Sequence, residues 1–145
     1  MSTSTIISCE IGTTDPLIPL GIEIWLDQDK IFYLDHVTGS FTFVKTVPEE
    51  EAEHELRFVM KNKLPEHTRI DNEGKIVQDA NLTISSIEFD EIALGQIFID
   101  QAVYSHDFNG NQPLTQQKFY GIMGCNGTVS LKFTTPIYVW MLEHM

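Results

Sequence analysis

Basic residues are scarce in this sequence, and their scarcity argues against several classes of partner. The 145 residues contain nine Lys and Arg against 21 Asp and Glu, which gives a formal net charge of −12. Nucleic-acid binding needs a basic patch that displaces counterions, and anionic membrane surfaces also attract basic segments. We therefore expect no nucleic-acid partner and no membrane partner. An excess of carboxylates is compatible with cations or with neutral, hydroxyl-rich ligands.

Cysteine and long apolar runs are also rare. Cys9 and Cys125 are too few for a disulfide framework, so their redox state stays open between one bridge and two free thiols. The N-terminal segment has no positively charged region and only two adjacent apolar residues, so we expect no signal peptide. No apolar run approaches the length of a membrane-spanning helix, and we expect a soluble chain.

Recognised catalytic motifs are missing. The sequence has no Gly-rich phosphate loop, no G-x-S-x-G elbow, no H-E-x-x-H helix and no paired C-x-x-C. His54, His67 and His106 lack the local spacing of metal ligands, and His54 shares its strand face with apolar residues, as a core histidine does. We therefore expect that the protein is not an enzyme. The alternative is a hydrolase or isomerase that uses dispersed carboxylates or a histidine-bound metal.

What the sequence does contain is a repeated alternation of apolar and polar side chains, which is typical of β-strands. It predicts strands at 22–26, 31–34, 41–47, 54–60, 68–70, 75–77, 82–89, 92–99, 103–108, 118–122, 128–133 and 137–142. Short strands at this spacing need a second sheet to cover their apolar faces. We predict one all-β domain over residues 1–145, a jelly-roll-like two-sheet β-sandwich whose residues 1–19 form an irregular N-terminal segment.

Two local segments have specific interpretations. Asp71-Asn-Glu-Gly74 begins like a calcium loop but lacks the later ligands, so we predict a hairpin turn there. The segment 137–142 is apolar on both faces, as in a central strand. At a sheet edge the same strand would be a surface for association with a second copy.

Trp25 is the first candidate ligand-binding residue. Its position in the alternation places it with Glu23 and Asp27, away from the apolar face of its strand. A Trp flanked by acceptors offers a flat platform for the C–H face of a sugar ring and partners for its hydroxyls. The alternative is that a loop or a second sheet covers Trp25.

The segment Val103–Gly110 supplies the second set of candidates. Tyr104 lies in its predicted strand, and Asp107 and Asn109 stand two residues apart near the turn that ends it. Oxygen ligands so placed can begin a calcium site or hydrogen-bond a sugar. The alternative is that Asp107 and Asn109 bond their own backbone in an Asx turn.

Several motifs resemble those of a known group of proteins. These are HELRF at 54–58, EHT at 66–68, GKIVQD at 74–79, YSHDFNG at 104–110 and FYGIMGCNG at 119–127. They resemble small proteins from marine cyanophages and ocean metagenomes, a group that in turn resembles the β-sandwich carbohydrate-binding modules, including calcium-dependent xylan binders. The resemblance implies a jelly-roll-like sandwich and non-catalytic glycan binding. For a viral protein it also implies a location on the virion or in the host cytoplasm.

We therefore predict a virus-encoded, non-catalytic carbohydrate-binding module, with calcium as its one candidate cofactor. Trp25, Tyr104 and Tyr120 are the predicted stacking residues, and Asp107 and Asn109 are the predicted polar or calcium ligands. The alternative function is a structural or assembly protein of a phage virion. Such a protein would form a homo-oligomer through its C-terminal strand.

Overall fold

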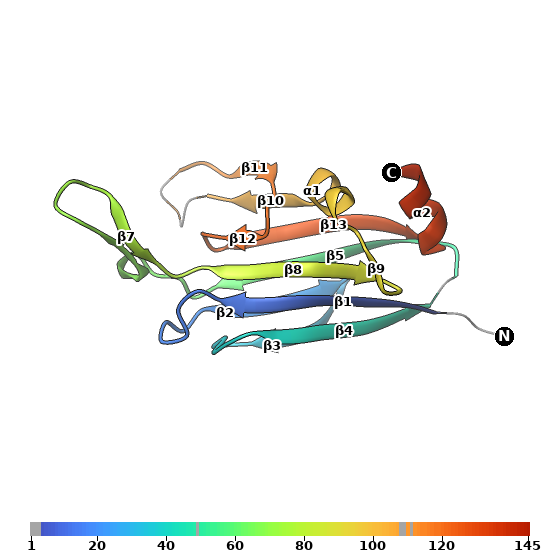
Figure 1. The fold of residues 1–145 in the computed structure, drawn as a ribbon, viewed down its shortest axis with the longest axis horizontal. Helices are drawn as coiled ribbons and strands as arrows, with labels where there is room; N and C mark the ends of the chain where they lie inside the picture. Colours follow the sequence, from blue (N-terminus) through green and yellow to red (C-terminus); the bar gives the residue numbers. More distant parts are fainter. Residues whose placement is uncertain (1–3, 49, 108–109, 111) are drawn as a thin grey trace.

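Two antiparallel sheets make up most of the protein (Figure 1). The computed structural model describes residues 4–48, 50–107, 110 and 112–145. The first sheet has the strand order β12-β8-β1-β4, and β9 pairs with β8. Its strands are β1 (Ser4–Thr13), β4 (Phe41–Pro48), β8 (Leu82–Phe89), β9 (Ile92–Ala93) and β12 (Ile122–Met123).

The second sheet is wider and has the order β11-β10-β13-β5-β2-β3. Its strands are β2 (Gly21–Leu26), β3 (Asp29–Leu34), β5 (Ala52–Lys61), β10 (Val103–His106), β11 (Thr115–Lys118) and β13 (Gly127–Thr135). A separate hairpin of β6 (Thr68–Ile70) and β7 (Ile76–Asp79) projects from one end of the sandwich (Figure 1). The 3-10 helix η1 (Pro65–His67) precedes this hairpin.

The core lies between the inner faces of the two sheets. Ile7 and Ile11 of β1 are fully buried, and so are Leu56 and Phe58 of β5. The residues that alternate with these buried ones, such as Ser8 and Glu10 in β1 and Arg57 in β5, point away from the core, so the alternation read in the sequence does place one face of each sheet inside. The predicted all-β, jelly-roll-like two-sheet sandwich is confirmed.

The prediction that residues 1–19 form an irregular segment is wrong. Residues 4–13 form β1, which pairs with both β4 and β8 and is therefore an interior strand of its sheet. Ile7, Cys9 and Ile11 alternate on its buried face, with exposed fractions of 0–1%. The alternation is weak in the sequence because the polar Thr5 points inward, at 0% exposed, and the apolar Ile6 points outward, at 45% exposed.

The predicted C-terminal strand at 137–142 is also wrong. Ile137–Glu143 form the helix α2, in which Ile137, Trp140 and Met141 are buried while Val139 and Leu142 are exposed. Burial at i, i+3 and i+4 is the helical period, not the two-residue period of a strand. Because Pro136 has no N–H for the ladder of β13, the strand cannot continue through it. An oligomer built on a C-terminal strand therefore has no such strand to use.

The segment 92–99 differs from its prediction as well. Only Ile92 and Ala93 are extended, and the chain then turns at Gly95, with φ +53°, into the helix α1 (Gln96–Gln101). The helix buries Ile97 and Phe98 over the core. Neither α1 nor α2 is long and apolar enough to cross a membrane.

The smaller predictions have mixed outcomes. Asp71–Gly74 is the predicted hairpin turn, since Asp71 Oδ1 accepts the N–H groups of Glu73 and Lys75, each at 2.9 Å. The sequence left open whether Cys9 and Cys125 form a bridge. Both are free thiols in the structure.

Candidate functional site

The outward face of the second sheet carries a continuous set of polar side chains. On β5 and β13 the outward residues pair across the strands, Arg57 opposite Ser130 and Glu55 opposite Lys132. Ser105 and Gln116 continue the row on β10 and β11, where they are also cross-strand partners. The sheet therefore presents alternating donors and acceptors over four neighbouring strands.

Two adjoining clefts lie on this face and at the end of the sandwich next to it. The central cleft has a volume of about 510 Å³ and is lined by Glu55, Arg57, Gln101, Val103, Ser105, Gln116, Thr128, Ser130 and Lys132. The terminal cleft has a volume of about 560 Å³ and is lined by Asp27, Glu53, His54, Glu55, Gln101, Lys132, Phe133, Thr134, Trp140, Glu143 and His144. Because Glu55, Gln101 and Lys132 line both, we treat the two clefts as one feature, the outer groove.

Hydrogen bonds hold the floor of the outer groove in place. Ser130 Oγ donates to Glu55 Oε2 at 2.6 Å, and Arg57 Nε lies 3.7 Å from Glu55 Oε1. Arg57 Nη2 also donates to the Asp27 carbonyl at 2.9 Å. Each of these side chains is partly exposed and held in place by its contacts, so the floor of the groove is already oriented.

Asp27 and His54 form a pair in the terminal cleft. His54 Nδ1 donates to Asp27 Oδ2 at 2.8 Å, and Asp27 Oδ1 accepts the Glu55 backbone N–H at 2.8 Å. Burial alone would raise the pKa of the Asp27 carboxyl, but these two hydrogen bonds outweigh it and hold the pKa below its usual value. The hydrogen bonds of Asp27 to His54 and Glu55 also fasten the tight turn between β2 and β3 to β5. Asp27 lies in this turn with φ +57°, a backbone conformation that non-glycine residues rarely adopt.

Trp25 lies on the outer face of the sheet and not between the sheets. It pairs with Arg57 across β2 and β5, and its ring centroid is 5.4 Å from Arg57 Cζ and 5.8 Å from Lys30 Nζ. Its indole N–H donates to Glu23 Oε1 at 3.0 Å. The hydrogen bond from Lys61 Nζ, and then that from Trp25, lower the pKa of the Glu23 carboxyl. Trp25 is therefore a partly exposed, fixed ring beside the central cleft.

The other predicted stacking residues lie elsewhere. Tyr104 is only 3% exposed, and its hydroxyl donates to the Cys125 carbonyl at 2.5 Å and accepts the Cys125 N–H at 2.9 Å. Its prediction as a stacking residue is wrong, because its strand position points into the core. Tyr120 is 73% exposed in the segment between β11 and β12. Neither Tyr120 nor Trp25 is among the lining residues of the two clefts, but Trp25 contacts the lining residue Arg57.

Asp107 caps its own turn, which is the alternative that the sequence left open. Its Oδ1 accepts the Gly110 N–H at 2.8 Å, and its carbonyl accepts the Gln112 N–H at 3.1 Å. Asn109 lies outside the described residues. Across the described part of the chain, no group of three or more His, Cys, Asp or Glu side chains could hold a metal ion.

The groove residues that sequence reasoning missed are Glu55, Ser130 and Lys132. The alternation of β5 and β13 does place them outward, but outward polar residues are usual on any sheet. His54 was interpreted as a core histidine, and it is half-buried with its ring 5.3 Å from that of Phe133. Its second role, the contact with Asp27 in the terminal cleft, has no signal in the sequence.

Two solved structures resemble this fold over nearly its whole length. The first is the selenomethionine form of vCBM60, from work on a circular-permutation link between two families of calcium-dependent carbohydrate-binding modules. It has a TM-score of 0.55, is 11% identical, and the match covers 88% of this chain and 89% of that one. The second is vCBM60 in complex with galactobiose, with a TM-score of 0.51, 12% identity, and coverage of 87% and 96%.

Comparison by sequence gives a different result. No protein-family model matches the chain, and no curated protein matches its sequence. The solved structures therefore establish a shared fold, that of the β-sandwich carbohydrate-binding modules.

Proposed function

We propose that this protein binds a carbohydrate in the outer groove and does not transform it. The observation that carries the proposal is the groove itself, a hollow face of fixed donors and acceptors with the partly exposed ring of Trp25 beside it. Small-molecule sites of this size bury most of a ligand and orient it with a few placed polar groups. The fold likeness supports the same class of ligand, since one of the neighbours is in complex with galactobiose.

The floor of the groove matches the chemistry of sugar hydroxyls. A hydroxyl both donates and accepts, and the central cleft offers the carboxylate of Glu55, the cations of Arg57 and Lys132, and neutral groups such as Ser105 and Gln116. These groups are arranged across neighbouring strands, so an extended chain of sugars could contact several at once. Because each contact replaces a hydrogen bond to water, we expect weak binding per sugar unit.

Two aromatic rings extend the groove along the sheet. Tyr33 on β3 is 59% exposed, and Lys30 Nζ lies 5.1 Å from its ring centroid and 5.8 Å from that of Trp25. A sugar ring can place its apolar C–H face on such rings while its edge hydroxyls reach Glu23 or Lys30. In this proposal Trp25 keeps its predicted stacking role and Tyr33 joins it.

Calcium does not enter this mechanism. Asp107 Oδ1 accepts the Gly110 N–H, and among the described residues no group of three or more His, Cys, Asp or Glu side chains could hold the ion. Calcium assistance stays a prediction that rests on the sequence resemblance and on the calcium dependence of the neighbouring modules. Virus encoding, and a location on the virion or in the host cytoplasm, also stay predictions from the resemblance alone.

A glycan array tests the proposal, run once with calcium and once with EDTA. We expect binding to one glycan class in both conditions. Trp25→Ala should weaken that binding about tenfold, as expected for an aromatic ring that stacks on the ligand beside the central cleft. Tyr120→Ala is the matched control, since Tyr120 is exposed outside the groove and should leave affinity unchanged.

Each other outcome would decide against part of the proposal. No binding to any glycan class would reject carbohydrate binding. Loss of affinity in Tyr120→Ala but not in Trp25→Ala would move the site away from the outer groove. Loss of binding in EDTA would show that calcium belongs to the site.

A further inference from the structure

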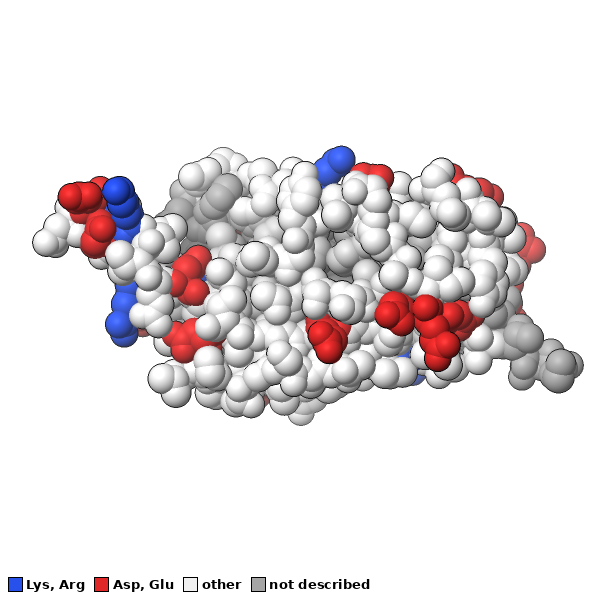
Figure 2. All heavy atoms as spheres, viewed as in Figure 1, with Lys and Arg blue, Asp and Glu red and all other residues white. Residues whose placement is uncertain are grey.

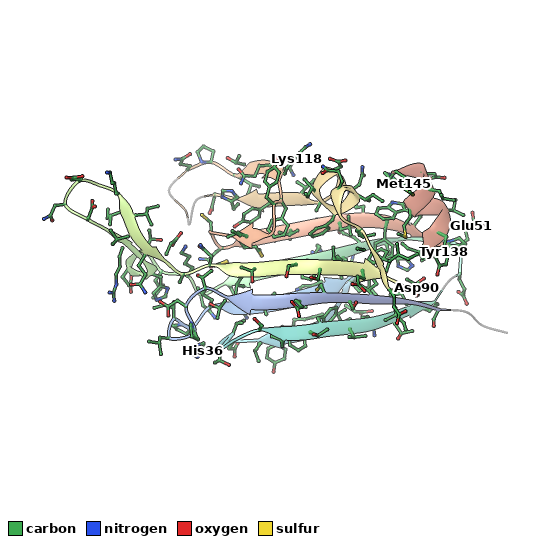
Figure 3. All side chains as sticks on the ribbon, viewed as in Figure 1. His36, Glu51, Asp90, Lys118, Tyr138 and Met145 are labelled. Carbon is green, nitrogen blue, oxygen red and sulfur yellow. The ribbon has the colours of Figure 1, made fainter. Side chains whose placement is uncertain are left out.

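A lysine is buried where the β6–β7 hairpin joins the sandwich, at the end of the molecule opposite Met145 (Figure 3). The side chain of Lys63 is 1% exposed, and its Nζ donates to Asp79 Oδ1 and to the Gly124 carbonyl, each at 2.6 Å. Thr68 Oγ1 donates to the same Asp79 oxygen at 2.6 Å. Lysine is almost never buried to this degree without a partner, because an ammonium group is costly to remove from water.

The charged side chains on the hairpin itself lie in a different environment. Figure 2 shows basic and acidic side chains together on its surface. Lys75, for example, is 77% exposed and its Nζ lies 3.7 Å from a carboxylate oxygen of Glu73, which is 76% exposed. Lys63 therefore differs from its neighbours in being shielded from water and held by short contacts.

The side-chain amide of Asn81 lies beside both members of the buried ion pair. One of its terminal atoms is 3.3 Å from Lys63 Nζ. As an oxygen this atom would accept from Lys63 but face two other acceptors. As the nitrogen Nδ2 it donates to Asp79 Oδ2 at 3.1 Å and to the Ala80 carbonyl at 3.0 Å, and we adopt this orientation. Because the C–N bond of an amide is about 1.33 Å long, Cγ of Asn81 lies at most about 4.6 Å from Lys63 Nζ.

Hydrogen bonds fix the backbone on both sides of this contact. The Lys63 N–H donates to Asn126 Oδ1 at 2.9 Å, and the Lys63 carbonyl accepts from Asn126 Nδ2 at 2.8 Å. The Asn81 N–H donates to Thr14 Oγ1 at 2.9 Å, and the Asn81 carbonyl accepts the Thr14 N–H at 3.0 Å. The fold therefore holds the amine and the amide at close range, and such positioning accelerates a reaction between two groups of one molecule.

We propose that Lys63 forms an amide cross-link with Asn81 in the folded protein and releases ammonia. The Lys63 ammonium passes a proton to Asp79, and the lone pair freed on Nζ forms a bond to Cγ of Asn81. Asp79 gives its proton to Nδ2 and takes a second proton from Nζ. The Cγ–Nδ2 bond then breaks, and ammonia leaves and removes the last proton from Asp79. The products are the Nζ–Cγ amide and an ammonium ion, with Asp79 again a carboxylate.

The ion pair makes the reaction slow, because Nζ has no free lone pair while it carries its third proton. Freshly folded protein therefore keeps the ion pair, and the linked form accumulates with time. The link closes a loop of residues 63–81, which contains η1 and the β6–β7 hairpin. It fastens the hairpin to the sandwich through a bond that, unlike a disulfide, does not depend on the redox state of its surroundings.

Intact mass spectrometry of the wild-type protein tests the proposal, with samples taken during a long incubation of the folded protein. We expect a growing fraction that is lighter than the sequence predicts by the mass of one ammonia molecule. A succinimide at the Asn-Gly pair 126–127 would lose the same mass, so a protease digest must also show the segments around Lys63 and Asn81 joined. Lys63→Met should never give joined segments, whereas the matched control Lys75→Met should accumulate them like the wild type.

The variant Asp79→Ala tests the proton transfer, since it keeps the amine of Lys63 and the amide of Asn81. It should stay unlinked over the same incubation. A wild type that keeps its full mass, or that loses ammonia without joined segments, would overturn the proposal and leave Lys63 in an ion pair alone. Joined segments that form in Asp79→Ala as fast as in the wild type would overturn the mechanism. The mass of the wild type decides the main question even if a variant fails to fold.

Discussion

The buried cation Lys63 gives the most direct test of how the loop-rich end of the sandwich is held together. Lys63→Met keeps most of the side-chain volume but removes the donations from Nζ, among them the short ones to Asp79 and to the Gly124 carbonyl. Breaking a fully buried ion pair costs about 3–5 kcal/mol, because the remaining charge loses its partner. Asp79 is 25% exposed and keeps the hydrogen bond from Thr68, so we expect a loss of about 2–4 kcal/mol in the free energy of unfolding.

Urea-induced unfolding, followed by fluorescence and analysed for the free energy in water, provides the assay. Lys75→Met is the matched control, because Lys75 lies in the β6–β7 hairpin but is 77% exposed, and its ammonium pairs with the equally exposed Glu73. It should change the free energy of unfolding by no more than about 0.5 kcal/mol. If Lys63→Met also fell within that range, the buried pair would not stabilise this end of the sandwich.

Three further predictions concern the core, the terminal cleft and the thiols. Trp140→Ala should lower the free energy of unfolding in urea by about 3–5 kcal/mol, because Trp140 is buried. Leu142→Ala, on the exposed side of α2, should lower it far less, and equal losses for the two variants would contradict the helical assignment. Because the pKa of Asp27 is lowered in the folded state, its contribution to stability is full above the ordinary value of 3.8 and is lost as pH falls through the folded pKa. The stability gap between the wild type and Asp27→Asn should therefore close in acid, and a gap that widened would contradict this sign. Burial raises the pKa of the Cys9 thiol to about 12, so a thiol reagent at pH 8 should modify Cys125 first. Rapid reaction at both cysteines would contradict the burial of Cys9 in β1.

The sandwich could be predicted because its signal is local. In β5 the buried residues Leu56, Phe58 and Met60 alternate with outward ones, and this pattern alone assigns a strand and its inner face. The same reasoning failed for α2, whose seven residues are apolar at nearly every position. Such a run fits a strand and a helix equally well, and only its packing against Phe89 and Phe133 decides for the helix.

The outer groove could not be predicted because it is assembled from distant segments. Ser130 and Glu55 are 75 residues apart in the sequence and become neighbours only when β13 pairs with β5. Trp25 was found because its type is unusual on the polar face of a strand. Tyr104 was misplaced because strand alternation gives two faces but not which face is inside, and the neighbouring polar residues suggested the outer one.

Mapping the ligand by NMR tests the central claim most directly. With the glycan class identified on the array, the backbone amide shifts of the labelled protein would be followed during titration. The account predicts the largest changes on β5, β13 and β2, around Arg57, Ser130 and Trp25, with the outer face of β4 unaffected. Changes confined to residues 107–114, or to the first sheet, would contradict binding in the outer groove.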